Sequence, residues 1–327
     1  MAIFPPKLTF GSQVRVVSPA RSLSMISADN IRLAVAQMAQ MGLKVSFSEH
    51  ASDVDEFISS SVENRVADLH DAFSDASVHA VFATIGGYNA NQLLQYLDYD
   101  LIARNPKILC GYSDITALGC AVYAKTGLVT YSGPAFSTFG MEQGFGYIAA
   151  GVRACLFSDM PYRITPAEFW SNDQWYADQL NRKFMPNEGY WILQPGHAGG
   201  TCIGGNLCTL NLLQGTEFMP PLENSILFLE DDHLSNPFIF DRDLQSLLHL
   251  PDAQGIKALI IGRFEQASGM RRPLLEQIIA SKKELKNIPV IANADFGHTM
   301  PLFTFPVGGV ARVSATTNEV MLEIEKH

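Results

Sequence analysis

The sequence predicts an α/β fold, with a doubly wound parallel sheet in the first half and a further set of strands and helices in the second. Two observations favour this fold. Short apolar runs alternate with stretches of helical periodicity, which is typical of consecutive βα units. Hydrophobic residues make up 47% of the 327-residue chain and charged residues only 17%, so the chain can bury one large or two ordinary cores.

Four βα units follow one another in the first half. Apolar runs predict the strands, and apolar residues three or four positions apart predict the helices, as at Val62, Val66 and Leu69. Ser27 or Asp29 is expected to cap the first helix. The predicted strands are residues 14–17, 45–47, 79–84 and 108–110, and the predicted helices lie around residues 31–38, 62–73, 89–97 and 115–125.

Residues 157–189 differ from both halves, because they hold proline, polar and several aromatic residues without a dominant period. We interpret this stretch as a domain connection followed by a long excursion, since long ordered loops are often functional. A plain linker with packed aromatic side chains is the alternative. The predicted division of the chain is therefore residues 1–160, 161–189 and 190–327.

Strand and helix signals resume after this stretch. The segment "GGTCIGGNLCTLNLLQGTEF" (199–218) predicts a glycine-rich turn that leads into a short helix. The tail 311–325 predicts a β-hairpin with its turn near Thr317 and Asn318. The other predicted strands are residues 190–193, 225–229, 258–261 and 289–292, and the other predicted helices are 238–250 and 273–285.

Charge and cysteine usage exclude several classes of protein. The net charge is −10, whereas a protein that binds nucleic acid needs a basic surface, and no run of Lys or Arg indicates a membrane surface. We expect no secretory signal and no membrane span. The five cysteines (110, 120, 155, 202 and 208) are scattered without Cys-x-x-Cys spacing, which argues against a disulfide framework or a zinc site and fits a reducing cytoplasm.

Ser113 lies at the sharp turn between a predicted strand and a predicted helix, in "ILCGYSDITAL". A serine there can cap the helix, or it can be a nucleophile exposed at the top of the sheet, where backbone N–H groups stabilise an oxyanion. The usual nucleophile turn reads G-x-S-x-G. Gly111 matches the first glycine but Ile115 replaces the second, so this turn alone leaves both interpretations open.

A nucleophilic serine needs a base and an orienting carboxylate. His298, in the loop "DFGHTMP" after a predicted strand, is the best placed of the eight histidines. Glu230 ends the apolar strand "SILFLE", and a buried acid there requires a partner. Its neighbours Asp231, Asp232 and His233 also allow a metal cluster, although no metal-binding spacing supports one.

Gly86 and Gly87 follow the predicted strand "AVFATI". Two glycines let backbone amides approach a substrate closely, as a phosphate cradle or an oxyanion hole. A plain tight turn explains them equally well.

Six motifs together resemble the LD-carboxypeptidase and microcin C self-immunity family of serine peptidases, over nearly the whole chain. They are "ATIGGYNANQLL", "GYSDITAL", "GGNLCTLNLLQGTEF", "LFLEDD…FDRDLQSLL", "IIGRFE" and "NADFGHTMPLFTFPVGG". The resemblance implies a Rossmann-like N-terminal domain with the nucleophile, and a mixed C-terminal domain of partly barrel-like β structure with the other two catalytic residues. It further implies a homodimer that needs no metal or cofactor. The implied triad is Ser113, Glu230 and His298, and the implied oxyanion donors are the N–H groups of Gly87 and Asp114.

Within the family, the chain is more similar to the immunity branch, which cleaves the bond between an aminoacyl or peptidyl group and a nucleotide-like group. The resemblance places Trp170 and Trp175 where that branch stacks a nucleobase, and Glu265 where it binds a free α-amino group. Gly86 and Asn206 are expected to bind substrate as well. The alternative for the two tryptophans is aromatic packing within a loop.

Three alternatives remain open from the sequence. One is a muropeptide LD-carboxypeptidase that releases terminal D-alanine with the same triad. Another is a non-catalytic protein that binds a ligand in the same groove. The third is a metal-dependent hydrolase that uses the acidic cluster.

Overall fold

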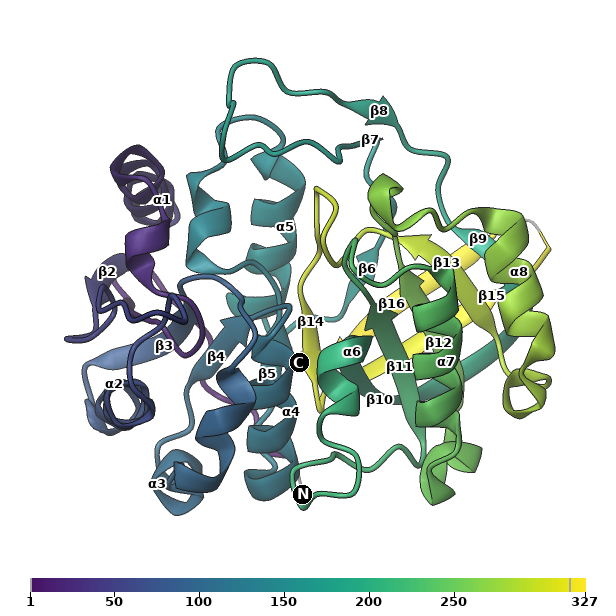
Figure 1. Ribbon diagram of the computed structural model, residues 1–327, viewed down its shortest axis with the longest axis horizontal. Helices are drawn as coiled ribbons and strands as arrows, with labels where there is room; N and C mark the ends of the chain where they lie inside the picture. Colours follow the sequence, from purple (N-terminus) through teal and green to yellow (C-terminus); the bar gives the residue numbers. More distant parts are fainter. Residues whose placement is uncertain (1, 318) are drawn as a thin grey trace.

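The computed structural model describes residues 2–317 and 319–327, which form two β-sheets side by side, each covered by helices (Figure 1). The first sheet has six strands in the order β14-β5-β4-β3-β1-β2. Neighbouring strands of this sheet are parallel, except that β14 pairs antiparallel with β5. Its strands are β1 (Gln13–Val17), β2 (Lys44–Phe47), β3 (Val78–Ala83), β4 (Ile108–Gly111), β5 (Thr130–Ser132) and β14 (Phe305–Val307).

Helices cover both faces of this sheet, which confirms the predicted doubly wound arrangement. Side chains alternate along β3, so Val81 packs into one core with Leu69 of α2, whereas Phe82 packs into the other with Met38 of α1. Figure 1 shows α1 and α5 above the sheet and α2, α3 and α4 below it. The helices are α1 (Ala28–Gln40), α2 (Val62–Ser74), α3 (Tyr99–Arg104), α4 (Ile115–Thr126) and α5 (Phe145–Leu156).

Local sequence signals explain where these helices begin. Ser27 rather than Asp29 caps α1, because its side chain accepts a hydrogen bond from the N–H of Asn30.

Residues Ala90–Tyr96, predicted as a helix, form a 3₁₀-helix. The pattern did not predict α3, β5 or α5. The 3₁₀-helices are η1 (Leu23–Met25), η2 (Ala90–Tyr96), η3 (Phe136–Gly140), η4 (Pro251–Gly255), η5 (Gln266–Ser268) and η6 (Lys283–Leu285).

The second sheet has eight strands in the order β6-β16-β15-β10-β11-β12-β13-β9. Its centre, β10 to β13, is parallel, and the strands on both sides are antiparallel. The mixed α/β character is therefore confirmed, but the sheet is open and does not close into a barrel. Its strands are β6 (Tyr162–Ile164), β9 (Trp191–Gln194), β10 (Gly196–Asn206), β11 (Ser225–Glu230), β12 (Ala258–Gly262), β13 (Val290–Ala294), β15 (Val310–Ala315) and β16 (Val320–Lys326).

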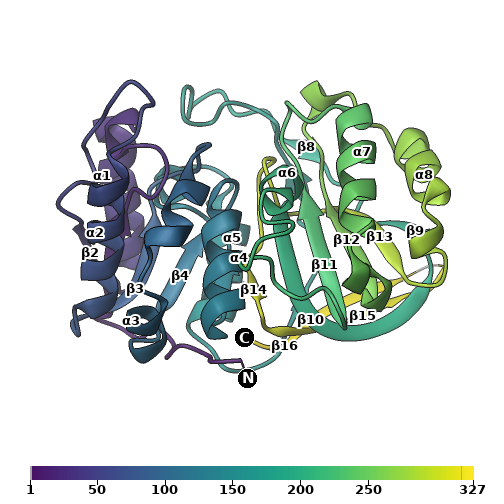
Figure 2. The ribbon, with the colours of Figure 1, turned by 60° about the horizontal axis from the view of Figure 1, so that its bottom comes forward.

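Three helices accompany this sheet, α6 (Leu207–Asn211), α7 (Pro237–Leu248) and α8 (Arg272–Ser281). Figures 1 and 2 show α7 and α8 beside each other on one face. The tail hairpin is formed by β15 and β16, and its predicted turn residue Asn318 lies outside the described residues. No helix of the described residues is long and apolar enough to cross a membrane.

The prediction of a glycine-rich turn is wrong for the first part of this segment, because residues Gly196–Asn206 form the long strand β10. Glycine carries no side chain, so these residues show no apolar alternation. The glycines are required by close approaches: a Cβ at Gly204 would lie 2.0 Å from the carbonyl oxygen of Phe228, and one at Gly205 would lie 2.4 Å from Oγ1 of Thr116. Only glycine lets β10 lie this close to β11 and α4.

The aromatic segment between the two sheets carries the short hairpin of β7 (Phe169–Trp170) and β8 (Met185–Pro186). It spans both halves of the molecule (Figures 1 and 2). On one side Gln179 Nε2 donates to the carbonyl of Gly140, and on the other the N–H of Gln266 donates to Asn172 Oδ1. The aromatic segment is therefore ordered and contacts both halves of the molecule.

Candidate active site

Loops at the carboxyl ends of parallel strands from both sheets face each other, which is where open α/β sheets bind ligands. From the first sheet come the loops after β1, β3 and β4, and from the second those after β10, β11, β12 and β13. Every site residue predicted from the sequence, except the two tryptophans, lies at or directly after one of these strand ends.

Ser113 lies in a strained turn between β4 and α4. Its φ of 62° is in the left-handed region, which a non-glycine residue adopts only at a cost of roughly 1–2 kcal/mol. Gly111 allows the tight approach, since a Cβ there would lie 2.9 Å from Cγ2 of Ile115. The N-cap position of α4 is Asp114, and the Ser113 hydroxyl contacts His298 instead of capping the helix.

Ser113, His298 and Glu230 form one hydrogen-bonded chain. His298 Nε2 lies 3.0 Å from Ser113 Oγ, and His298 Nδ1 lies 2.7 Å from Glu230 Oε2. The Glu230 carboxylate can only accept, so Nδ1 carries a hydrogen and Nε2 of the neutral ring accepts the serine proton. Glu230 is 3% exposed, and Gly297 permits this burial because a Cβ there would lie 2.5 Å from Glu230 Oε2.

The surroundings of His298 favour the charged ring. Burial opposes the charge, but the nearby Glu230 carboxylate and its hydrogen bond outweigh burial and raise the pKa of His298 to about 9. Asp232 and Glu265 act in the same direction. The arrangement therefore stabilises an imidazolium, which is what a base needs after it has taken a proton.

Gly86 lies against Ser113, since a Cβ there would lie 3.0 Å from Ser113 Oγ. Across the described residues, the N–H groups of Gly87 and Asp114 donate to no protein acceptor. The buried Asp114 carboxylate accepts hydrogen bonds from the N–H groups of Asn89 and Ala90, both at 2.9 Å. It thereby fixes the glycine loop beside the serine turn, a positioning role that the sequence pattern did not predict.

Asn206 is buried at the end of β10, and both polar atoms of its side chain are hydrogen-bonded within the protein. Oδ1 accepts from the N–H and the hydroxyl of Thr209, and Nδ2 donates to Asp231 at 3.3 Å. Its backbone N–H donates to Oγ1 of Thr116 in α4. This hydrogen bond joins Asn206 to α4, the helix that follows Ser113. Burial, with the neighbouring carboxylates of Glu230 and Asp232, raises the pKa of Asp231 to about 7.

Glu265 lies in the loop after β12. Its Oε2 accepts a hydrogen bond from the N–H of His233 at 2.8 Å and lies 3.3 Å from the His233 ring nitrogen Nδ1. Because it also influences the pKa of His298, Glu265 lies in the same electrostatic neighbourhood.

The two tryptophans have different environments. Trp170 is half-buried, and the guanidinium of Arg263 lies 4.9 Å from its ring centroid. Trp175 is 7% exposed and packs in the core of the first sheet, with Tyr176 against its edge. In this structure Trp175 therefore has no free ring face, whereas Trp170 borders the loops of the site.

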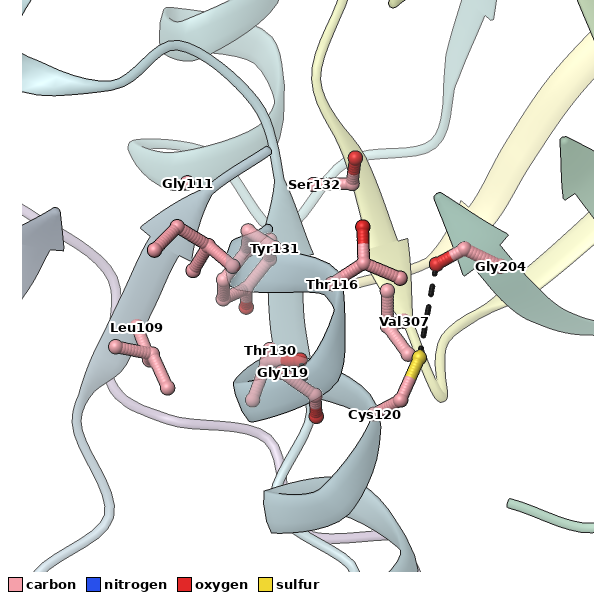
Figure 3. Close-up of a pocket in the computed structure, with 11 residues that line it drawn as sticks. Leu109, Gly111, Thr116, Gly119, Cys120, Thr130, Tyr131, Ser132, Gly204 and Val307 are labelled. Atoms are coloured by element: carbon pink, nitrogen blue, oxygen red, sulfur yellow. Dashed lines mark hydrogen bonds between the residues drawn. The ribbon is translucent and has the colours of Figure 1, made fainter. Parts of the chain in front are cut away.

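Two cavities lie near these residues. A hollow of about 490 Å³ lies within the aromatic segment, lined by Asn172, Asp173, Gln174, Ala177, Asp178, Asn181, Lys183, Met185 and Gln266. A second cavity of about 10 Å³ lies beneath the serine turn, between α4 and the strands (Figure 3). It has room for about one water molecule. There Cys120 Sγ contacts the Gly204 carbonyl at 3.6 Å, which makes the second cavity part of the joint between the sheets (Figure 3).

The sequence pattern also missed two neighbours of the triad. The ring of Tyr112 packs beside that of His298, with 5.5 Å between the two ring centroids. Arg21, in the loop after β1, packs against Gly87. Tyr112 could have been suspected as the neighbour of Ser113, but Arg21 reaches the site only because β1 pairs with β3. In the described part of the chain, no three His, Cys, Asp or Glu side chains are grouped so as to hold a metal ion.

Comparison with known proteins gives consistent matches. Residues 14–133 match the LD-carboxypeptidase N-terminal domain, and residues 199–313 match the LD-carboxypeptidase C-terminal domain. The chain is 52% identical over 325 residues to the Bacillus subtilis (strain 168) protein named "Putative carboxypeptidase YocD", covering 99% of this chain and 100% of that one.

Two solved structures are similar over nearly their full length. One is an MccF-like protein from Bacillus anthracis str. Ames, with 51% identity, a TM-score of 0.99 and full coverage of both chains. The other is MccF in complex with glutamyl sulfamoyl guanosine, with 27% identity and a TM-score of 0.87, covering 99% of this chain and 98% of that one.

Proposed function

Because the chain belongs to the LD-carboxypeptidase family, we propose that it is a serine hydrolase of carboxypeptidase type with Ser113, His298 and Glu230 as its triad. The observation that carries the proposal is the hydrogen-bonded chain from Ser113 Oγ through His298 to Glu230, with distances of 3.0 and 2.7 Å. Ser113 and His298 lie in loops and Glu230 lies at the end of strand β11, and together they come from both sheets. Such convergence, combined with the strained φ of the serine, is typical of an activated nucleophile.

In the proposed mechanism, His298 Nε2 takes the proton of Ser113, and Oγ attacks the carbonyl carbon of the scissile amide. Glu230 keeps the hydrogen on Nδ1 and stabilises the imidazolium. The imidazolium then protonates the leaving nitrogen, so the amine departs and an acyl-enzyme remains. Water, deprotonated by His298, hydrolyses the ester and restores the serine.

The N–H groups of Gly87 and Asp114 are the proposed oxyanion donors. Both are free of protein acceptors among the described residues and flank the nucleophile from two loops. One such donor contributes about 100- to 1000-fold in kcat. The hydrogen bonds from Asn89 and Ala90 to Asp114 hold these two loops in register.

For the substrate, we propose an aminoacyl or peptidyl group joined by an amide-like bond to a nucleotide-like group. The similar MccF structure binds glutamyl sulfamoyl guanosine, which has this architecture. In this chain Trp170 is half-buried at the site, and base–aromatic stacking contributes about 1–3 kcal/mol per base. Glu265 supplies a carboxylate for a free α-amino group.

The second candidate is a muropeptide LD-carboxypeptidase that releases terminal D-alanine. The description of both matching domains and the carboxypeptidase name of the 52%-identical relative support it. The triad and the oxyanion donors would act in the same way on this substrate.

The test is to incubate the purified chain with an aminoacyl sulfamoyl adenosine and with a muropeptide tetrapeptide, and to identify products by mass spectrometry. Cleavage of the first alone supports the nucleotide-like substrate, and release of D-alanine from the second alone supports the second candidate. Ser113→Ala is expected to lose about 10⁴-fold or more in kcat. Ser52→Ala, at an exposed loop residue, is the matched control.

If neither substrate is cleaved, or if Ser113→Ala keeps near-full activity, the proposed function is wrong. The same assay is repeated with EDTA. Activity that survives the chelator would exclude the metal-dependent hydrolase.

A further inference from the structure

Arg21 lies beside the proposed oxyanion loop. Its N–H faces the carbonyl of Gly86 at 3.4 Å, and a Cβ at Gly87 would lie 3.2 Å from Arg21 Cγ. Gly86 in turn lies against Ser113. The aliphatic part of the Arg21 side chain therefore packs on Gly87, whose N–H is a proposed oxyanion donor. The preceding residue, Gly86, is the one that contacts Ser113.

The guanidinium of Arg21 has no ionic partner within the described residues. It makes no ion pair and donates no hydrogen bond there, and its contact is with the exposed ring of Tyr88, whose centroid lies 5.1 Å away. Within the described residues, three other arginines also make no ion pair and donate no side-chain hydrogen bond, namely Arg104, Arg153 and Arg271. All three are exposed. Arg21 alone among these four is half-buried.

A half-buried guanidinium without an acceptor has lost water without gaining a hydrogen bond. Its five donors form a planar fork that suits a carboxylate or a phosphate. Stacking on Tyr88 holds the fork at the mouth of the site without using those donors. The observations therefore point to an anion as the group that Arg21 is arranged to bind.

The charges around the triad are separated. Glu230, Asp232 and Glu265, which favour the charged form of His298, come from the second sheet. Arg21 comes from the first sheet. Burial raises the pKa of Asp114, the residue after Ser113, and the positive charges of Arg65 and Arg21 oppose that rise. A substrate with a positive group on one side of the scissile bond and a negative group on the other would be oriented by this separation.

We propose that Arg21 binds the anionic group of the leaving amine, a terminal carboxylate or a phosphate-like group, and so restricts the enzyme to anionic leaving groups. The inference rests on the proposed function and extends it to the recognition of the leaving group. In both candidate substrates an anionic group lies within a few bonds of the scissile nitrogen. The acyl side would carry the free amine, which belongs with Glu265, so the anion falls to the opposite side, where Arg21 lies.

The kinetic test compares substrates that carry this anionic group with analogues that lack it. For the carboxylate, a tetrapeptide ending in D-alanine is compared with its C-terminal amide. For the phosphate-like group, an aminoacyl sulfamoyl adenosine is compared with the uncharged amide of 5′-amino-5′-deoxyadenosine. Wild type is expected to prefer the charged member of the pair it cleaves. Arg21→Gln should lose about 10- to 100-fold in kcat/KM on that member and little on the uncharged one.

Arg21→Lys keeps the charge without the fork and should lose less than Arg21→Gln. Arg104→Gln removes a positive charge from an exposed position on α3 and should behave as wild type. A general defect of folding would lower activity on both members of a pair equally. Equal losses, or no loss, would therefore overturn the proposal.

A binding measurement separates this inference from the proposed function. AMP and D-alanine are titrated into the full-length wild-type chain and into Arg21→Gln by calorimetry. At least one should bind to wild type and bind at least tenfold more weakly to the variant, even if no substrate is cleaved. If neither binds wild type, or if both chains bind alike, Arg21 is not an anion site. By contrast, the absence of Ser113-dependent hydrolysis in the wild type would count against the proposed function.

Discussion

Glu230→Gln removes the charge next to His298 and keeps nearly the same volume at a residue that is 3% exposed. In the wild type, the pKa of His298 rises from 6.5 to about 9, because Glu230 and its hydrogen bond outweigh burial. A difference of that size corresponds to about 3 kcal/mol in favour of the imidazolium. Glutamine removes the favourable charge and leaves burial, which acts in the opposite direction, so the pKa of His298 should fall below 6.5.

The measurable consequence is the pH dependence of kcat/KM. Only the neutral ring accepts the serine proton, so wild-type activity should rise with pH and reach half its plateau between 6.5 and about 9. In Glu230→Gln the rise should shift to lower pH by about two units. The plateau should fall by about 10³- to 10⁴-fold, since the imidazolium formed in the reaction has lost its partner.

The assay is a profile of kcat/KM from about pH 5 to 10 on the cleaved substrate. Glu223→Gln, at an exposed glutamate before β11, is the charge-matched control and should follow wild type. A wild-type rise centred below 6.5, or an identical rise in both enzymes, would contradict the assignment of Glu230 as the partner of His298.

Three further outcomes follow from the packing. Gly205→Ala places a Cβ 2.4 Å from a side-chain oxygen of α4 and should lower kcat/KM about tenfold or more, whereas Gly146→Ala, with no atom within 4 Å, should not. Asp114→Ala leaves two backbone N–H groups without their acceptor, so thermal unfolding should show a loss of about 1–3 kcal/mol for each that stays buried, with a lower kcat. Arg263→Met leaves the buried Asp295 carboxylate unpaired and should reduce the free energy of unfolding in urea by about 3–5 kcal/mol, and adding Asp295→Leu should restore part of it.

Elements with a clear apolar period were predictable from the sequence. In α2 and α7 the buried side chains recur at helical spacing, and β11 is an uninterrupted apolar run that ends at Glu230. The apolar runs of β4 and β13 placed Ser113 and His298 after strand ends. Apolar periodicity did not predict β10, where glycine makes the contacts. It also did not predict α3 and β5, which are short elements that depend on tertiary packing.

Distances between loops could not be read from periodicity. The order of the strands decides that the loops after β1 and β3 are neighbours, and hence that Arg21 packs on Gly87. Likewise, an aromatic residue in an aperiodic segment has no pattern that separates packing from binding. Trp170 and Trp175 are five residues apart, yet one lies beside Arg263 and the other in a core.

The antiparallel pairing of β14 with β5 has a consequence for how the protein is made. Residues Phe305–Val307 complete the edge of a sheet whose other strands all lie within the first 132 residues. During synthesis on the ribosome, β5 must therefore wait, with one side unpaired, for more than half of the chain. Unpaired strand edges promote association between chains. A fragment that stops before β14 should therefore aggregate, and the nascent chain should depend on chaperones until β14 has emerged.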